Sequence, residues 1–316
     1  MKHVPHYTKI LTIGSRYTEN ALVGEVIIQE KVDGSQFRFG VNEDKELVIA
    51  SKSIQIHPEA VQKLFKPAVD HVLAMKRRIL SFAPDTYFYA ETLCKPKHNV
   101  LKYNNVPLNH IVLFDVLENG KWASRERLES IAAVLKIDII PELYRGTIER
   151  KRIDTGAGGY KSSAIDFLKR IIETTPSYLG NEKVEGVVIK NYKQTILLGG
   201  QVFPLFTKRV REAFKERHDI EWKTRKPKAS VQDYINGFQS DARWQKAVIH
   251  LREKGLLTQS PKDIGLLIKT VQQDIVEEEK ENIMNYLYKH FSKDILRISV
   301  KGLPEWYKEK LLENLK

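Results

Sequence analysis

The hydrophobic pattern of this chain changes its period once, close to residue 215. Between residues 26 and 206, short apolar or alternating segments such as VIIQE, SQFRFGV and TYFYAE are separated by glycine, asparagine, aspartate and proline. This pattern is typical of β-strands joined by turns. After residue 215 the apolar residues recur every three to four positions, which is typical of helices. The sequence therefore predicts a sheet-rich part followed by a helical part.

Three segments within the sheet-rich part also have helical periodicity. They are residues 59–80, 125–136 and 163–173, where apolar residues recur at three and four spacing. We therefore expect an α+β fold, with one domain over residues 1–220 and an all-helical domain over residues 221–316. The basic segment KTRKPKAS at 223–230 is interpreted as a linker. Ser260, followed by proline and Asp263, is a predicted helix start.

Composition limits the partners and the metals to be expected. The chain has 52 Lys and Arg against 40 Asp and Glu, a formal charge of +12, which favours an acidic polymer as partner. Charge alone does not distinguish nucleic acid from a membrane. No apolar run approaches the roughly 20 residues of a membrane span, and the first residues lack a signal peptide's apolar core, so we expect a cytoplasmic protein that binds no membrane. With one cysteine, Cys94, and no Cys/His cluster, any catalytic metal should be a hard cation bound by oxygen.

A candidate nucleophile lies in the segment EKVDGSQF, residues 30–37, directly after the apolar run Val26 to Ile28. A lysine at the end of a buried strand, beside an acid and a glycine, suits an amine that attacks a phosphate. The segment alone is weak evidence, because an exposed lysine beside a turn gives the same pattern. Only a neutral amine attacks, so we expect the site to lower the pKa of Lys31 by burial, by a bound metal and by cations such as Lys190 and Lys208.

Four further clusters of carboxylates or lysines follow in order at strand-like positions. They are YFYAETL at 87–93, VLFDVLE at 112–118, EGVVIK at 185–190 and FTKRV at 206–210. Taken singly, each acid is more often a solvated strand end, each lysine a surface residue and Phe114 a core residue. Together with residues 30–37, the ordered series resembles the motifs of the covalent nucleotidyltransferases, which include ATP-dependent DNA ligases, RNA ligases and messenger RNA capping enzymes.

The resemblance implies a nucleotidyltransferase fold, with ATP-grasp-like antiparallel sheets and helices, and a role for each matching residue. Lys31 would attack the α-phosphate of ATP. Glu91 would contact the ribose and Phe114 would stack on the adenine, with Asp115 following it. Glu185 would hold Mg²⁺ or Mn²⁺, or the phosphates through the metal. The implied catalytic group is Lys31, Asp33, Lys190 and Lys208, and the implied nucleotide-binding group is Glu30, Lys31, Gln36, Lys52, Glu91, Phe114, Glu185, Lys190 and Lys208.

Two features favour the RNA ligase branch of this superfamily. Gln36 is an amide where DNA ligases and capping enzymes usually have arginine, and the residues after 216 read as helices instead of a small barrel of strands. The chain departs from RNA ligase 2 relatives at Lys52, where arginine is frequent, and in having Phe206 before Lys208 where they have a second lysine.

The expected partner is RNA, as a nicked duplex or as single-stranded ends, and no obligatory protein partner is evident. Three alternatives stay open: a GTP-dependent capping-type guanylyltransferase, an ATP-dependent DNA ligase, and an RNA-binding protein with a silent nucleotidyltransferase fold. The sequence does not distinguish sealing of nicks from joining of single strands.

Overall fold

The computed structural model describes residues 3–14, 16–148, 152–154, 160–198, 200–214 and 231–313. The predicted linker at 223–230 and the predicted boundary at residue 220 lie outside these ranges. The strands are β1 (Leu11–Thr12), β2 (Glu25–Lys31), β3 (Ser35–Val41), β4 (Leu47–Ser51), β5 (Thr86–Thr92), β6 (Ile111–Glu118), β7 (Lys121–Trp122), β8 (Asp138–Ile139), β9 (Glu142–Thr147), β10 (Arg152–Asp154), β11 (Tyr160–Ser162), β12 (Gly186–Leu198) and β13 (Gln201–Val210). The α-helices are α1 (Lys66–Ala74), α2 (Lys76–Ile79), α3 (Arg125–Leu135), α4 (Ser163–Thr174), α5 (Val231–Asn236), α6 (Asp241–Glu253), α7 (Ile264–Ser299) and α8 (Leu303–Glu313).

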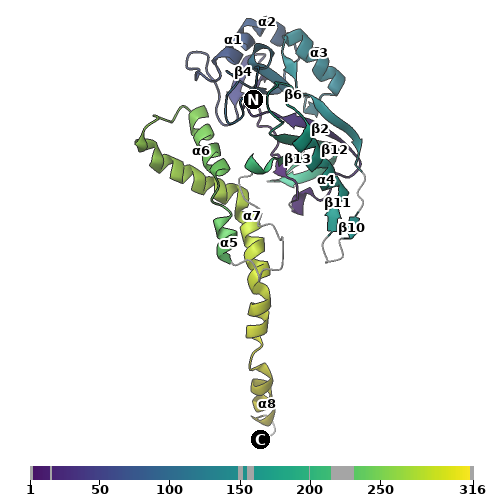
Figure 1. The fold of residues 1–316 in the computed structure, drawn as a ribbon, viewed down its shortest axis with the longest axis vertical. Helices are drawn as coiled ribbons and strands as arrows, with labels where there is room; N and C mark the ends of the chain where they lie inside the picture. Colours follow the sequence, from purple (N-terminus) through teal and green to yellow (C-terminus); the bar gives the residue numbers. More distant parts are fainter. Residues whose placement is uncertain are drawn as a thin grey trace.

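Two large, mostly antiparallel sheets and a separate antiparallel pair, β10 and β11, form the first part of the chain (Figure 1). The first sheet has the order β1-β13-β12-β2-β9, and the second has the order β4-β3-β5-β6-β7, with β8 pairing to β6. The apolar and alternating segments of the sequence thus form strands, and the fold is the predicted α+β arrangement with a helical C-terminal region.

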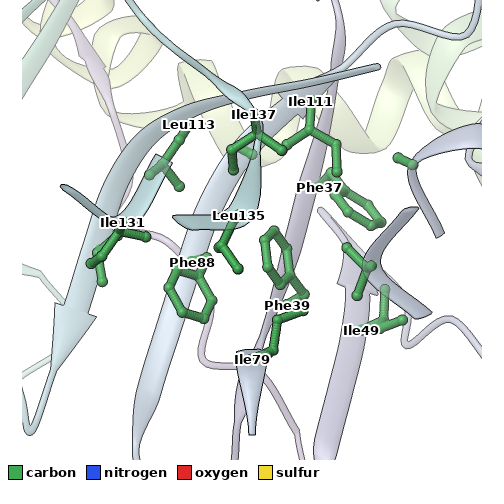
Figure 2. Packing of buried hydrophobic residues seen from close by; sticks show 14 of the residues in the cluster. Phe37, Phe39, Ile49, Ile79, Phe88, Ile111, Leu113, Ile131, Leu135 and Ile137 are labelled. Carbon is green, nitrogen blue, oxygen red and sulfur yellow. The ribbon is translucent and has the colours of Figure 1, made fainter. Parts of the chain in front are cut away.

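Each sheet is covered on its outer face by helices. Side chains of α4 pack with β2 and β12 on the first sheet. On the second sheet, α1, α2 and α3 cover an aromatic and aliphatic core in which Phe37, Phe39 and Phe88 are almost fully buried (Figure 2). These phenylalanines alternate along their strands with residues of the opposite face, because successive strand side chains point to opposite sides of a sheet.

The inner faces of the two sheets meet, and the N-terminal segment lies against them. Tyr7 packs against Tyr89 of β5 and Phe206 of β13, with ring centroids 5.1 and 6.0 Å apart. Trp122 of the second sheet also lies 6.0 Å from Phe206. Residues predicted to belong to the site project from these inner faces, so the space between the sheets is where the chemistry should be sought.

The helix predicted over residues 59–80 is shorter than expected. The structure begins α1 at Lys66, with Pro67 in the first turn, and interrupts the helix at Met75. Proline lacks a backbone N–H and suits only the first helical turn, which explains the late start. The other two predicted helices, α3 and α4, are confirmed.

The C-terminal region is helical as predicted. Ser260 begins a short helical turn with a reciprocal capping box to Asp263, as its position in the sequence indicates. The guanidinium of Arg243 is fully buried in α6 and pairs with Asp274 and Glu279 of α7, which fixes α6 against α7. None of the helices in the described part of the chain is long and apolar enough to span a membrane.

Candidate active site

Lys31 ends β2 and lies beside the start of β12. The antiparallel register sets Lys31 opposite Gly186, which brings the lysine next to Glu185. Its Nζ donates hydrogen bonds to both carboxylate oxygens of Glu185, each at 2.7 Å. The lysine side chain keeps 28% of its surface exposed, so a ligand can reach the amine. Gly186 lets β13 pack closely against β12 at this point, because a Cβ there would lie 2.3 Å from the carbonyl oxygen of Arg209.

The amine of Lys31 is held in its charged form in this state. Burial acts to lower the pKa of Lys31, but the charge and hydrogen bonds of Glu185, with Glu91 and Asp33, raise it above its usual value. This corrects the expectation of a lowered pKa with Lys190 as a contributor, since Lys190 is paired elsewhere. Lys31 must therefore exchange its contact with Glu185 for another before it can act as a nucleophile.

Charged residues from several neighbouring motifs influence the pKa of Glu185. Burial raises the pKa of Glu185 and Asp33 adds to this, whereas Lys31 and Lys208 lower it. Lys208 lies opposite Val188 in the register of β12 and β13, and opposite residues of an antiparallel pair point to one face. Lys31, Glu185 and Lys208 are thus brought together, as the resemblance implies.

Glu91 approaches the same cluster from the second sheet, where it lies opposite Gln36 in the register of β3 and β5. Its Oε2 is buried and has no hydrogen-bond partner among the described residues. Burial raises the pKa of Glu91 to about 8, against the lowering effect of Lys31. A buried polar oxygen without a partner is rare in folded proteins, which makes Glu91 Oε2 a candidate for binding a ligand.

We expect Glu91→Gln to stabilise the protein more at pH 8 than at pH 5. The carboxyl ionises near 4.5 when unfolded and near 8 when folded, so the folded state loses stability as pH rises through this window. A glutamine does not titrate, and the gain in unfolding free energy at pH 8 should be about 4 kcal/mol. Thermal unfolding at the two pH values measures this. The exposed control Glu59→Gln should show no such difference, and an equal change in both variants would contradict the assignment.

Two of the predicted acids bind neighbouring loops. Asp33 Oδ2 accepts hydrogen bonds from the backbone N–H groups of Val100 and Leu101, both at 2.7 Å. Glu30 accepts from the Ser177 hydroxyl at 2.5 Å and from the Tyr178 N–H at 3.1 Å. Both carboxylates hold a loop against the end of β2, and their catalytic and nucleotide-binding roles stay predictions.

Gly34 is required by close packing, not by its backbone angles. A Cβ at this position would lie 2.9 Å from both Leu93 Cδ1 and the Thr92 carbonyl oxygen, and 3.2 Å from Glu91 Oε2. We expect Gly34→Ala to lower the unfolding free energy by about 1–3 kcal/mol and to reduce activity, because it displaces Glu91. Thermal unfolding and activity are measured together. The matched control Gly265→Ala, where a Cβ meets nothing within 4 Å, should keep both; equal behaviour of the two variants would contradict this explanation.

A second buried cluster lies deeper between the sheets. Lys190 Nζ donates to Asp115 Oδ2 at 2.7 Å and to the Phe114 carbonyl at 2.8 Å, and both charged side chains are 1% exposed. The Tyr192 hydroxyl donates to Asp115 Oδ1 at 2.9 Å, and the Tyr7 hydroxyl donates to Oδ2. Burial lowers the pKa of Lys190, although Asp115 opposes this.

Lys190 therefore does not join the cluster around Lys31. It lies on the same face of β12 as Gly186 but four residues further, about 13 Å along the strand. Phe114 is the extra residue of a β-bulge, since Tyr89 pairs with Asp115 and Ala90 with Leu113, and a bulge re-aims a side chain. The Phe114 ring packs edge-on against Tyr7 at 5.0 Å.

Two predicted residues lie outside the contacts described so far. Gln36 is half-buried opposite Glu91, and Lys52 is exposed just after β4. Tyr7 and Tyr192 were not predicted as site residues. Tyr192 follows the fourth motif by two positions, which is a weak signal, whereas nothing in the pattern around Tyr7 indicates its contact with Asp115.

The donors present suit a hard cation that arrives with phosphate ligands. Among the described residues no group of three or more His, Cys, Asp or Glu side chains is arranged to hold a metal ion. The unpartnered Oε2 of Glu91 and the buried carboxylate of Glu185 are nevertheless the oxygen donors that Mg²⁺ or Mn²⁺ accepts.

A lysine and acids from facing strands, gathered between two antiparallel sheets, are consistent with the covalent nucleotidyltransferases. The model of the RNA ligase family matches residues 24–215, which is more than half of the chain and contains all five motifs. The chain therefore belongs to the RNA ligase family. No curated protein matches it.

Solved structures of ligases are similar to this chain at low identity. A Naegleria gruberi RNA ligase with PPi is 14% identical, with a TM-score of 0.46, and the match covers 66% of this chain and 57% of that one. A putative ATP-dependent DNA ligase from Aquifex aeolicus is 15% identical, with a TM-score of 0.40, covering 91% of this chain and 68% of that one. The chain thus spans less than two thirds of the Naegleria protein, and the likeness concerns the fold alone.

Proposed function

We propose that this protein is an ATP-dependent RNA ligase that forms a lysyl-AMP at Lys31, transfers AMP to a 5′-phosphate end and seals that end to a 3′-hydroxyl. The observation that carries the proposal is the contact of Lys31 with Glu185, with Glu91 and Lys208 close enough to influence their charges. The family match supports the same reading. The net charge of +12 suits a polyanionic substrate.

In the first step the Lys31 amine attacks the α-phosphate of ATP. The Nζ–P bond forms, the bond from the α-phosphorus to the bridging oxygen breaks, and pyrophosphate leaves with the electron pair. The ammonium must first leave its contact with Glu185 and then lose a proton, which passes to solvent water. Lys208 supports the reaction by placing positive charge where phosphate charge develops.

The second step returns Lys31 to its free state, and the third step joins the RNA ends. The 5′-phosphate oxygen displaces Lys31 from AMP, so the N–P bond breaks and a pyrophosphate linkage forms. The 3′-hydroxyl then attacks the 5′-phosphate, forms the phosphodiester and expels AMP. Both are phosphoryl-group displacements governed by positioning and charge neutralisation.

The proposed reaction also requires a divalent cation. Glu185 would hold it, with Glu91 close by, and the cation would neutralise phosphate charge during transfer. The fifth-motif position occupied by Phe206 is apolar and packed among aromatic rings, so Lys208 is the lysine that this motif would supply to the phosphates.

A sealing assay on defined nicks tests the proposal. The duplexes carry RNA or DNA on each side of the break, are compared with single-stranded RNA, and are supplied with ATP or GTP and Mg²⁺. We expect sealing with ATP when the 3′-hydroxyl end is RNA, because the 2′-hydroxyl distinguishes RNA from DNA. Transfer from GTP to a 5′-diphosphate RNA would instead identify a capping enzyme, and equal sealing of DNA nicks a DNA ligase. Salt-sensitive RNA binding without nucleotide transfer would leave only the silent binding protein.

A further inference from the structure

The last turn of α6 contacts the turn that follows the nucleophilic lysine. The Arg252 guanidinium donates a hydrogen bond to Asn99 Oδ1, and Asn99 Nδ2 donates in turn to the Gly34 carbonyl at 2.7 Å. Figure 1 shows α6 beside the sheet-rich part while α7 extends away from it. The helical region thus reaches residue 34 through one intermediate side chain.

A second chain of hydrogen bonds reaches the next residue. Glu253 is 8% exposed and shares a hydrogen bond with the Ser35 side chain. The Ser35 hydroxyl oxygen lies 2.8 Å from His98 Nε2, and His98 Nδ1 accepts the N–H of Cys94 at 3.1 Å. Burial lowers the pKa of His98 to about 4, so a single proton remains on the ring near neutral pH. Because Nδ1 accepts, this proton is on Nε2 and points at Ser35, whose own proton is left to bind Glu253.

The contacts of Arg252 and Glu253 with the sheet-rich part use charged groups where apolar packing would cost less free energy. The free-energy cost of removing a guanidinium and a carboxylate from water is compensated only when both find well-placed partners. Apolar side chains could pack a helix against a loop without this cost. Arg252 and Glu253 instead direct their hydrogen bonds to Asn99, which binds Gly34, and to Ser35, the first residue of β3. The loop they use, residues 94–103, is also the loop that Asp33 holds by two backbone N–H groups.

The turn at residues 34 and 35 is in close contact with Glu91 of the candidate site. Gly34 packs so closely on Glu91 that a Cβ would lie 3.2 Å from Oε2. The charge of Glu253 is also felt at Glu91, where it adds to the effect of burial in raising the pKa. A movement of α6 would therefore be transmitted to Glu91 and to the end of β2.

We propose that Arg252 and Glu253 are positioning residues, through which the helical region holds Gly34 and Ser35 in the geometry that nucleotide transfer to Lys31 requires. This inference rests on the proposed function. It gives the helical region a role in the first step of the reaction. This region lies outside residues 24–215, which the family model matches.

The test compares Glu253→Leu, Glu253→Gln and Arg252→Ala in the full chain. We expect Glu253→Leu and Arg252→Ala to lower the kcat of Lys31 labelling from ATP by about tenfold or more while the KM for ATP changes less than about twofold, because positioning acts on the reacting geometry. Glu253→Gln keeps an acceptor for Ser35 and should restore most of the rate. The matched control Glu309→Gln, an exposed position of α8, should leave the rate unchanged.

Hydrogen exchange at residues 31–35 and 94–103 is measured in the same variants and does not depend on activity. Faster exchange there in Glu253→Leu and Arg252→Ala, with unchanged thermal unfolding, is the expected result. If the wild-type protein takes no label but exchange still rises, the contact stands and the proposed function fails. The inference would be overturned if both variants were labelled at the wild-type rate, or if hydrogen exchange were unchanged in both. If Glu253→Leu fails to fold, Arg252→Ala alone decides between these results.

Discussion

Lys31→Ala is expected to lose nucleotide transfer onto the protein while retaining the ability to seal RNA ends that already carry AMP. The substitution removes the amine that ends β2 and contacts Glu185 at 2.7 Å, so no N–P bond can form. The last step needs only the 3′-hydroxyl as nucleophile and depends on Glu185, Glu91 and Lys208, which remain. Labelling from radioactive ATP should fall by a factor of about a thousand or more, and sealing of pre-adenylylated nicks should persist.

Lys289→Ala provides the control for this experiment, since it removes an exposed lysine from α7. Its labelling should equal that of the wild-type protein. A Lys31→Ala variant that still takes up label would show that another residue is the nucleophile. A variant that loses both labelling and sealing of pre-adenylylated ends would show that Lys31 is needed for more than the first transfer.

Asp115→Ala is expected to destabilise the protein by about 3–5 kcal/mol, because it leaves the ammonium of Lys190 buried without its counter-charge. Lys190 and Asp115 are each 1% exposed, and the hydroxyl groups of Tyr7 and Tyr192 would lose their acceptor as well. Denaturant unfolding followed by circular dichroism measures the loss. The effect should also reach Phe114, because this residue precedes Asp115 in the bulge of β6.

The double variant Asp115→Leu, Lys190→Met separates charge from packing in this cluster. If an unpaired buried charge is the cause, the double variant should be more stable than Asp115→Ala alone, because replacing both partners of a buried ion pair by apolar residues is often close to neutral. A double variant that is no more stable than Asp115→Ala would assign the loss to the tyrosine hydrogen bonds and to packing.

The central part of the site was accessible from the sequence because each of its residues lies within two positions of an end of an apolar strand. Lys31, Glu91, Glu185 and Lys208 were predicted from four separate motifs, and the structure brings them together between the sheets. The two-residue period of the strands does not by itself predict that these four residues lie close together. It became predictable when the order of the motifs was compared with that of a known superfamily.

Other features depend on contacts between residues far apart in the sequence. Lys190 was expected to act on Lys31 because it is a cation of the fourth motif, yet four residues of strand separate it from Gly186, and Asp115 binds it instead. Tyr7 comes from a segment without periodicity, and its contact with Asp115 spans 108 positions. The approach of Arg252 to Asn99 spans 153 positions, and helical periodicity around residue 252 says nothing about which loop the helix end will meet.

Incubating the wild-type protein with ATP and Mg²⁺, followed by intact mass measurement and peptide mapping under conditions that preserve a phosphoramide, tests the central claim most directly. We predict a gain of one AMP per chain, located on the peptide that contains Lys31, and release of that AMP on addition of RNA with a 5′-phosphate. An unmodified protein, or AMP attached to a different residue, would contradict the assignment of Lys31 as the nucleophile.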